Sequence, residues 1–179
     1  MKVRIIMGKN YTGESNKYIV NSETTVILGI SGGEILIDTC DIEKTKNYKW
    51  IVNNGYSVAS YKVNDGYKTI YMHRTIMNAP KGIDVDHINH NKLDNRKINL
   101  RLVDECQNLW NMKTPITNKS GTKGVSFYSA RNRWEAGIKV RSKKIHLGKF
   151  KNIEDAIKAR KEAEIKYHGE YRFISQEGS

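Results

Sequence analysis

One stretch decides the fold of this chain: Val85-Asp86-His87-Ile88-Asn89-His90-Asn91-Lys92-Leu93-Asp94-Asn95-Arg96-Lys97-Ile98-Asn99-Leu100-Arg101. It is crowded with Asn, Asp, His and Lys, a composition that is typical of a functional site rather than of a hydrophobic core. Asn99 follows His87 by twelve residues, and Asn108 follows Asn99 by nine. Asp86, His87, Asn99 and Asn108 are therefore the candidate site.

These four residue types can together hydrolyse a phosphodiester. The reaction needs a group that deprotonates water, a cation that stabilises the departing oxygen, and a frame that holds both in place. A neutral imidazole such as that of His87 is suited to general-base work near neutral pH. The carboxylate of Asp86 and the amide oxygen of Asn108 are hard ligands of the kind that Mg²⁺ accepts.

The stretch from Val85 to Arg101, followed by Gln107-Asn108, resembles the HNH motif of phage and intron-encoded homing endonucleases. This resemblance implies the ββα-metal fold, in which two short strands and a helix hold one divalent metal ion. It implies that His87 is the general base, that Asp86 and Asn108 bind the metal, and that Asn99 braces the loop and orients the histidine as part of the catalytic set. Mg²⁺ is the expected ion, with Mn²⁺ as the alternative, and no organic cofactor is expected. Asn108 stands where some members have histidine, which leaves the metal preference open.

The segment Tyr71-Met72-His73-Arg74 also resembles the residues that precede the HNH hairpin in these proteins. On this reading Arg74 contacts a DNA phosphate. The alternative is that His73 and Arg74 are ordinary residues at the end of a strand.

A zinc site receives less support from the sequence. Cys40 and Cys106 are the only cysteines, so neither a disulfide framework nor a paired Cys-x-x-Cys site is expected. His90 is interpreted as a surface histidine of the loop. Zinc bound by His90 and Cys106 remains an alternative.

The charge of the chain indicates a nucleic-acid partner. The formal net charge of the 179 residues is +12, and residues 118–179 hold 15 Lys and Arg against 7 Asp and Glu. A positive surface attracts polyanions and gains affinity by counterion release. An anionic membrane is the weaker alternative, since no apolar run approaches a membrane span. The N-terminal residues do not have the pattern of a secretory signal, so we expect the cytoplasm of a bacterial or phage-infected cell.

The region before the HNH-like stretch is predicted to be rich in strands. Residues 26–30 and 34–38 flank Ser31-Gly32-Gly33, and residues 56–63 and 67–72 flank Asn64-Asp65-Gly66, so each pair predicts a hairpin. The second hairpin is predicted to run on into residues 73–77. Residues 41–48 are predicted to form a short helix, and another helix is predicted to begin after Asp104 as its N-cap.

The last third of the chain has the clearest pattern. Apolar and polar residues alternate over 125–128, 134–141 and 144–148, which predicts three strands with one apolar face. Apolar residues at helical spacing from Ile153 to Tyr167 predict one helix that covers this face, with Asn152 as its N-cap. The charged helix residues Lys158, Arg160, Lys161 and Lys166 are interpreted as solvated, and Trp134 as core rather than as a stacking residue.

Residues 120–169 resemble the plant ethylene-response-factor (Apetala-two) type of DNA-binding domain. The resemblance implies a sheet that lies in the major groove of DNA and a helix that packs behind it, a geometry that the strand alternation also favours. Ser126 matches the contact face of that family, and several arginines of the plant proteins are replaced here, which leaves the base preference open. The residues assigned to DNA binding in this region are Tyr128, Arg131, Arg133, Lys139, Arg141, Lys144 and His146.

The sequence as a whole predicts an α+β protein in which a β-rich region leads into a ββα-metal HNH unit, followed by a three-stranded antiparallel sheet packed on one helix. The expected divisions are a nuclease domain at 1–112, a linker at 113–122, a DNA-binding domain at 123–172 and a tail at 173–179. The predicted function is that of a metal-dependent homing endonuclease acting on double-stranded DNA as a monomer or homodimer. The alternative is a DNA-binding regulator with an inactive HNH site. An RNA-binding protein is a third hypothesis, and the sequence lacks the exposed aromatic platform that single-strand recognition tends to use.

Overall fold

The structure, a computed structural model, describes residues 4–7, 15–112 and 114–173, and the chain divides into two compact units, Met1–Val103 and Asp104–Ser179. Both units combine small antiparallel sheets with few helices, which confirms the α+β class. The sequence placed its first division after residue 112, whereas the compact units divide after Val103. The functional domain boundaries stay a prediction, and residues 174–179 of the predicted tail lie outside the described residues.

The first unit begins with a four-stranded antiparallel meander. Ser31, Gly32 and Gly33 lie between its last two strands, as the hairpin prediction required, and both glycines have positive φ (92° and 90°). Such angles suit glycine because it has no Cβ. The strands are β1 (Arg4–Met7), β2 (Lys17–Val20), β3 (Thr24–Leu28) and β4 (Glu34–Asp38).

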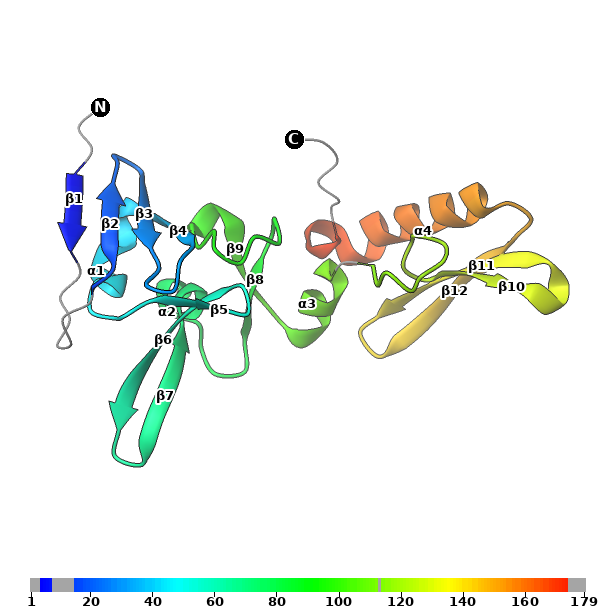
Figure 1. The fold of residues 1–179 in the computed structure, drawn as a ribbon. Coiled ribbons are helices and arrows are strands. Elements are labelled where there is room, and N and C mark those ends of the chain that lie inside the picture. The colour runs from blue at the N-terminus through cyan, green and yellow to red at the C-terminus, as the bar shows by residue number, and fades with distance from the viewer. Residues whose placement is uncertain (1–3, 8–14, 113, 174–179) are drawn as a thin grey trace. The chain divides into compact units, whose positions relative to one another are not determined.

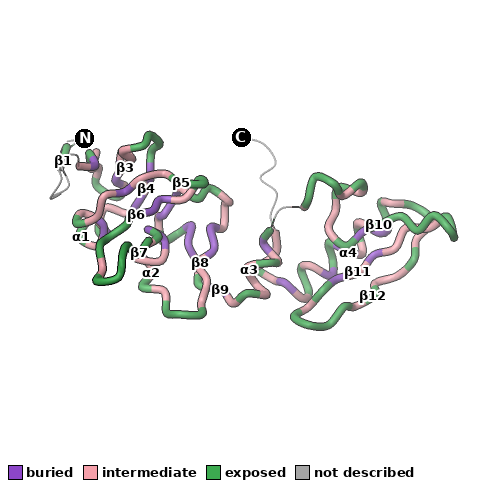
Figure 2. Tube along the Cα trace, turned by 60° about the horizontal axis from the view of Figure 1, so that its bottom comes forward, coloured by how far each residue is buried: buried purple, intermediate pink, exposed green. Residues whose placement is uncertain are grey.

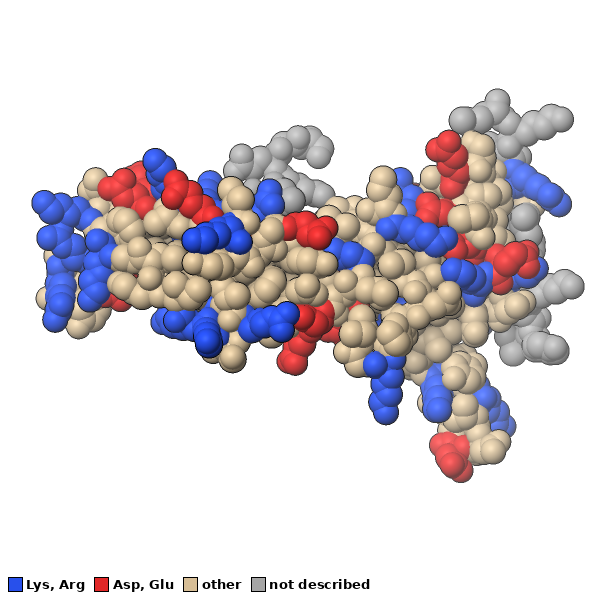
Figure 3. All heavy atoms as spheres, turned by 180° about the vertical axis from the view of Figure 1, so that it is seen from behind, with Lys and Arg blue, Asp and Glu red and all other residues tan. Residues whose placement is uncertain are grey.

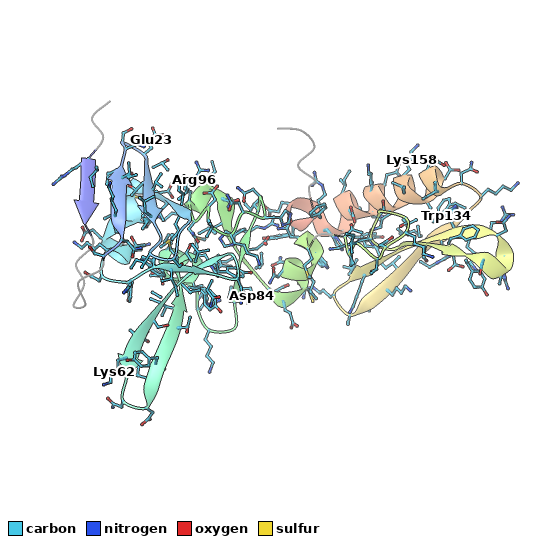
Figure 4. All side chains as sticks on the ribbon, in the orientation of Figure 1. Glu23, Lys62, Asp84, Arg96, Trp134 and Lys158 are labelled. Carbon is cyan, nitrogen blue, oxygen red and sulfur yellow. The ribbon has the colours of Figure 1, made fainter. Side chains whose placement is uncertain are left out.

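A second sheet of three strands follows after a short helical segment (Figure 1). The helical segment consists of a 3-10 turn, Thr39–Asp41, and α1 (Ile42–Thr45), and is shorter than the predicted 41–48. The sheet is formed by β5 (Ile51–Asn53), β6 (Tyr56–Val63) and β7 (Gly66–Tyr71). The β6–β7 hairpin projects from the rest of its unit, with Lys62 on it (Figure 4).

The residues after β7 form a helix, so the prediction that the strand runs on into residues 73–77 is wrong. Helix α2 spans Met72–Met77 and ends at Asn78, which adopts the left-handed conformation (φ 47°). Met72 and Ile76, one helical turn apart, are both buried in the core. Burial of this apolar pair outweighs the strand-like pattern of the preceding residues.

The HNH-like stretch forms two short antiparallel strands, β8 (Asp84–His87) and β9 (Leu100–Val103), with a 3-10 turn at Lys97–Asn99. The core of this unit gathers buried side chains from both larger sheets, α2 and β9 (Figure 2). Its largest member, Trp50, is fully buried and donates a hydrogen bond from Nε1 to the Thr45 carbonyl (2.9 Å). A rigid body of several layers therefore carries the two strands.

The second unit begins with α3 (Glu105–Asn111) and continues as a three-stranded antiparallel sheet with one long helix. Asp104 and Gln107 form a reciprocal capping box at the start of α3, in the place predicted. The sheet order is β10 (Val125–Tyr128), β11 (Arg133–Val140), β12 (Lys143–Phe150), and α4 (Ile153–His168) packs on it, with 3-10 turns at Ser129–Arg131 and Gly169–Tyr171. Asn152 occupies the N-cap position of α4 but makes no side-chain cap bond, unlike the prediction.

The interpretation of Arg160 as a solvated charge is wrong. This side chain on α4 is only 5% exposed, and its guanidinium donates to the Gly137 carbonyl (2.6 Å) and to Glu164 (2.9 Å). Gly137 lies at an irregularity of the β11–β12 register. Arg160 therefore ties the helix to the sheet. By contrast, Lys158 is exposed, as expected, and Trp134 of β11 packs against the core of this unit (Figure 4).

Candidate nuclease site

Asp86 and His87 are neighbours at the end of β8, and both are buried, with exposed fractions of 8% and 5%. Arg101, the residue directly opposite Asp86 on β9, donates from Nε (2.9 Å) and Nη2 (2.7 Å) to Asp86 Oδ2. A buried carboxylate needs such a partner because desolvation of an unpaired charge is costly. The Arg101 guanidinium therefore holds the Asp86 carboxyl in place beside the imidazole.

Asn99 closes the loop between the two strands. Its Oδ1 accepts a hydrogen bond from the Asn89 backbone N–H (2.9 Å), and its Nδ2 donates to the Asp94 carbonyl (2.8 Å). Its own carbonyl accepts from Ile88 N–H (2.9 Å). These contacts agree with a bracing role for Asn99, while its part in catalysis stays a prediction.

Two further polar side chains stiffen the same loop. Asp94 is buried and accepts from Arg96 through Nε and Nη2, both at 2.7 Å, and from Asn89 Nδ2 at 3.1 Å. Burial tends to raise the pKa of Asp94, but the bonds from Arg96 outweigh it and hold this pKa below its ordinary value. Asp94 therefore stays ionised and the loop stays cross-linked.

The imidazole of His87 lies in a cluster of rings. His73 of α2 meets it edge to face with ring centroids 5.0 Å apart, and Tyr56 lies 5.6 Å from His73 and 6.3 Å from His87. Burial is the main cause that lowers the pKa of both histidines, and it brings the pKa of His73 to about 3. Asn95 and Asp86 oppose the lowering at His87. Both rings are therefore neutral at pH 7, the state that a general base requires.

Sequence reasoning missed His73 and Asn95 as members of this cluster. His73 is 7% exposed, and its Nδ1 has no hydrogen-bond partner among the residues that the structure describes. Asn95 is fully buried and lies 3.4 Å from His87, measured from Oδ1 to Nε2. The Asn-Asp-His composition of the loop and the Tyr-Met-His-Arg segment were the available signals, but neither indicated which side chains would meet.

The loop is also fixed to the N-terminal sheet. Leu36 of β4 donates from its N–H to the Leu93 carbonyl, and Asn95 donates from its N–H to the Leu36 carbonyl, both at 2.8 Å. Asp38, at the end of the same strand, accepts from the Lys97 N–H at 2.8 Å. The N-terminal sheet therefore holds the loop that carries the candidate site.

The Arg74 side chain forms hydrogen bonds with backbone carbonyls in this structure. Its guanidinium donates to the carbonyls of Ile83 (2.7 Å), Pro80 (2.9 Å) and Ala79 (3.4 Å), which shapes the turn between α2 and β8. The alternative that His73 and Arg74 are ordinary strand-end residues is wrong, since both lie on α2 and His73 is buried against His87. The phosphate contact of Arg74 stays a prediction.

Asn108 lies on α3 in the second unit, so the meeting of Asn108 with Asp86 that the sequence predicts stays a prediction. Within residues 4–7, 15–112 and 114–173, no group of three or more His, Cys, Asp or Glu side chains is arranged so that it could hold a metal ion. The predicted donor set of one carboxylate and one amide instead fits a hard divalent ion that keeps water and phosphate among its ligands.

The second unit presents a basic sheet face opposite α4. Across this face Lys139 pairs with Lys144, Gly137 with His146 and Tyr128 with Arg133, while the one acidic residue there, Glu135, contacts Lys149 (3.1 Å). Basic side chains gather at the end of this unit in Figure 3. The DNA-binding residues predicted here are exposed or half-exposed, with Arg131 and Arg141 in the turns: Tyr128, Arg131, Arg133, Lys139, Arg141, Lys144 and His146.

No helix among the described residues has the length and apolar character needed to span a membrane. This finding concerns helices alone.

Comparison with known proteins identifies one region. Residues 71–109 match the family model of the HNH endonuclease. Protein 3.8 of Escherichia phage T7 is 44% identical over 64 residues, which cover 36% of this chain and 53% of that protein. An uncharacterised HNH endonuclease of Acanthamoeba polyphaga mimivirus is 36% identical over 94 residues, which cover 51% of this chain and 47% of that protein.

The chain thus spans about half the length of the relatives it matches. No solved structure shows significant similarity to it. The matched residues include α2, both strands of the candidate site and most of α3. Residues 71–109 of the chain are therefore similar to the HNH endonuclease family.

Proposed function

We propose that this protein is a DNA endonuclease of the homing type, in which His87 activates water for attack on a phosphodiester. The observation that carries the proposal is a buried, neutral imidazole beside a carboxyl group that Arg101 holds in place, both on one strand of the region that matches the HNH model. A base that is neutral at pH 7 accepts a proton from water during attack, and general-base catalysis of this kind contributes about 10²–10⁴-fold to a rate.

Asp86 and Asn108 would hold the metal ion of this proposal. Mg²⁺ is the expected ion and Mn²⁺ the alternative, because both prefer oxygen ligands and octahedral coordination. When bound, the ion stabilises the charge that develops on the departing oxygen. Arg101 fixes one oxygen of Asp86 and so sets the direction of the carboxylate. Asn99 keeps the loop closed around the base.

The basic face of the C-terminal sheet is the proposed source of affinity for duplex DNA. Lys139 and Lys144 lie directly opposite each other on neighbouring strands. Like charges in this arrangement destabilise a sheet, and a bound polyanion removes that repulsion. An antiparallel ribbon is also narrow enough to enter the major groove. The likeness to the ethylene-response-factor type supports this placement by analogy only.

The test is cleavage of plasmid DNA by the purified chain with Mg²⁺, Mn²⁺ or chelator, with the cut ends mapped. We expect metal-dependent nicking or cutting that His87→Ala reduces by at least about 100-fold while DNA binding is retained. The matched control is Lys158→Ala, which removes an exposed side chain outside both the proposed site and the proposed DNA-binding face. Cleavage by His87→Ala at the wild-type rate would exclude His87 as the base. DNA binding by the wild type without any cleavage would favour the regulator with an inactive site.

A further inference from the structure

Asn95 is the side chain that the proposed mechanism leaves without a role. It is fully buried, and its Oδ1 lies 3.4 Å from His87 Nε2. A buried amide is costly unless its donors and acceptor are satisfied. The contacts of the Asn95 amide therefore show which of its atoms faces the proposed base.

The orientation of the Asn95 amide follows from its other contacts. Its Nδ2 donates to the Leu93 carbonyl (3.2 Å) and to Ser57 Oγ (3.3 Å), so both of its N–H groups are used. A carbonyl oxygen can only accept a hydrogen bond, so the reversed amide would place two acceptors against each other. Oδ1 is thus the atom that faces His87.

This orientation determines the proton position on His87. An amide oxygen only accepts, so the nitrogen that faces it, Nε2, must carry the hydrogen when the ring is neutral. The lone pair of the neutral ring then lies on Nδ1. We propose that Asn95 is a positioning residue that selects the Nε2–H tautomer of His87 and leaves Nδ1 as the basic nitrogen. This inference rests on the proposed function for its catalytic meaning, although the tautomer itself is a property of the folded protein.

Distant parts of the chain hold Asn95 in place. The Leu36 carbonyl on β4 accepts from the Asn95 N–H, and Ser57 on β6 contacts its side chain. The backbone of the residue is thus clamped by one sheet and its amide by the other. The tautomer of the proposed base is therefore set through residues outside the HNH motif.

The first experiment measures the tautomer directly. The full chain, with ¹⁵N-labelled histidine and without metal, is examined by long-range ¹H–¹⁵N correlation spectroscopy at a pH where His87 is neutral, and His87→Gln assigns its signals. We expect the pattern of an Nε2–H ring. An Nδ1–H ring at His87 would overturn the proposal, and this measurement needs neither a variant of Asn95 nor cleavage activity.

The second experiment removes the acceptor. Asn95→Leu keeps the approximate size of the side chain, and we expect it to mix the two tautomers of His87 and to lower kcat about 100-fold with little change in KM for DNA. Asn95→Asp retains an acceptor oxygen and is expected to recover part of the lost kcat. The matched control is Asn91→Leu in the same loop. The Asn91 side chain is exposed and accepts a hydrogen bond from the Leu93 N–H (3.1 Å) rather than facing His87.

The outcomes separate the two proposals. An Nε2–H ring in a wild-type protein that cuts no DNA refutes the nuclease and leaves the tautomer assignment standing. A folded Asn95→Leu that keeps the wild-type tautomer and kcat refutes the role of Asn95, even if the nuclease is active. If Asn95→Leu does not fold, the wild-type tautomer decides.

Discussion

His73 makes the stability of the first unit depend on pH, and His73→Phe is the change that exposes this dependence. The ring of His73 is 7% exposed and packs against the rings of Tyr56, Tyr71 and His87. In the described part of the chain its Nδ1 has no hydrogen-bond partner. Phenylalanine preserves the packing but cannot bind a proton. The wild type and His73→Phe should therefore differ chiefly in how much their free energy of unfolding falls at acidic pH.

The magnitude follows from the two pKa values. Burial lowers the pKa of His73 in the folded chain to about 3 from an ordinary value of 6.5. Below pH 6.5 the unfolded chain binds a proton that the folded chain refuses, so stability is lost as the pH falls from about 6.5 to about 3. Between pH 7.5 and pH 5 the loss from this residue is about 2 kcal/mol. The pKa of His87 is lowered too, so it adds to the loss with the same sign in both proteins.

The assay is equilibrium urea unfolding at the two pH values, followed by the fluorescence of Trp50 in a background that carries Trp110→Phe and Trp134→Phe. Trp50 is fully buried in the core of the first unit, so it reports the unfolding of the part that contains His73. We expect the pH-dependent loss in free energy of unfolding to be smaller in His73→Phe by about 2 kcal/mol.

The control is His146→Phe, which replaces an exposed histidine in the second unit and should leave the pH dependence unaltered. Equal losses in the wild-type background and in His73→Phe would refute the reasoning. They would mean that His73 is protonated as readily in the folded chain as in the unfolded chain.

Three further predictions concern the loop, the second unit and DNA binding. Asn99→Ala removes two hydrogen bonds that brace the loop and should lower the free energy of unfolding by about 2–4 kcal/mol, measured by urea unfolding; a loss within error of zero would refute the bracing role. Arg160→Leu removes the tie between α4 and Gly137 and leaves buried partners, so thermal unfolding of the second unit should show a loss of about 2–4 kcal/mol, whereas Lys158→Leu on the exposed side should show almost none. Lys139→Ala combined with Lys144→Ala should weaken duplex DNA binding at low salt and reduce the slope of log K against log salt by about 2; an unchanged slope would exclude the sheet face.

The elements with strict periodicity could be predicted from the sequence. The period of two over residues 125–148 placed three strands where the structure has them, because one face of each strand is covered by α4. The N-cap of α3 could be predicted because the Asp104 side chain accepts from a backbone N–H only three residues along the chain. Turn residues likewise placed both N-terminal hairpins.

The short helix α2 was missed because six residues give too little periodicity to distinguish a helix from the end of a strand. Its formation depends on Met72 and Ile76 entering a core built by distant strands. The prediction for Arg160 failed because its burial also depends on a distant partner. That partner is the Gly137 carbonyl, which lies where the β11–β12 register is irregular. Local sequence does not show such irregularities.

The candidate site divides in the same way. The sequence could group Asp86, His87 and Asn99 because the first two lie on β8 and Asn99 ends the 3-10 turn at the other end of the same short loop. The contacts that shape the chemistry come from elsewhere: His73 from α2, Ser57 from β6 and the Leu36 backbone from β4. The motif thus supplies the reactive groups, and the fold decides their protonation.

The N-terminal sheets hold the loop of the candidate site, a role that their composition alone does not suggest. Leu36 contributes only backbone atoms, so any apolar residue of similar size at this position preserves its bonds, and sequence patterns cannot reveal its importance. A proline at position 36 is different, because it removes the N–H that holds the Leu93 carbonyl. That carbonyl also orients the Asn95 amide, so the loss of one backbone hydrogen bond in β4 should reach the imidazole of His87 through two intervening groups. The environment of His87, the proposed base, therefore depends on a backbone hydrogen bond of β4, a strand that holds none of the proposed site residues.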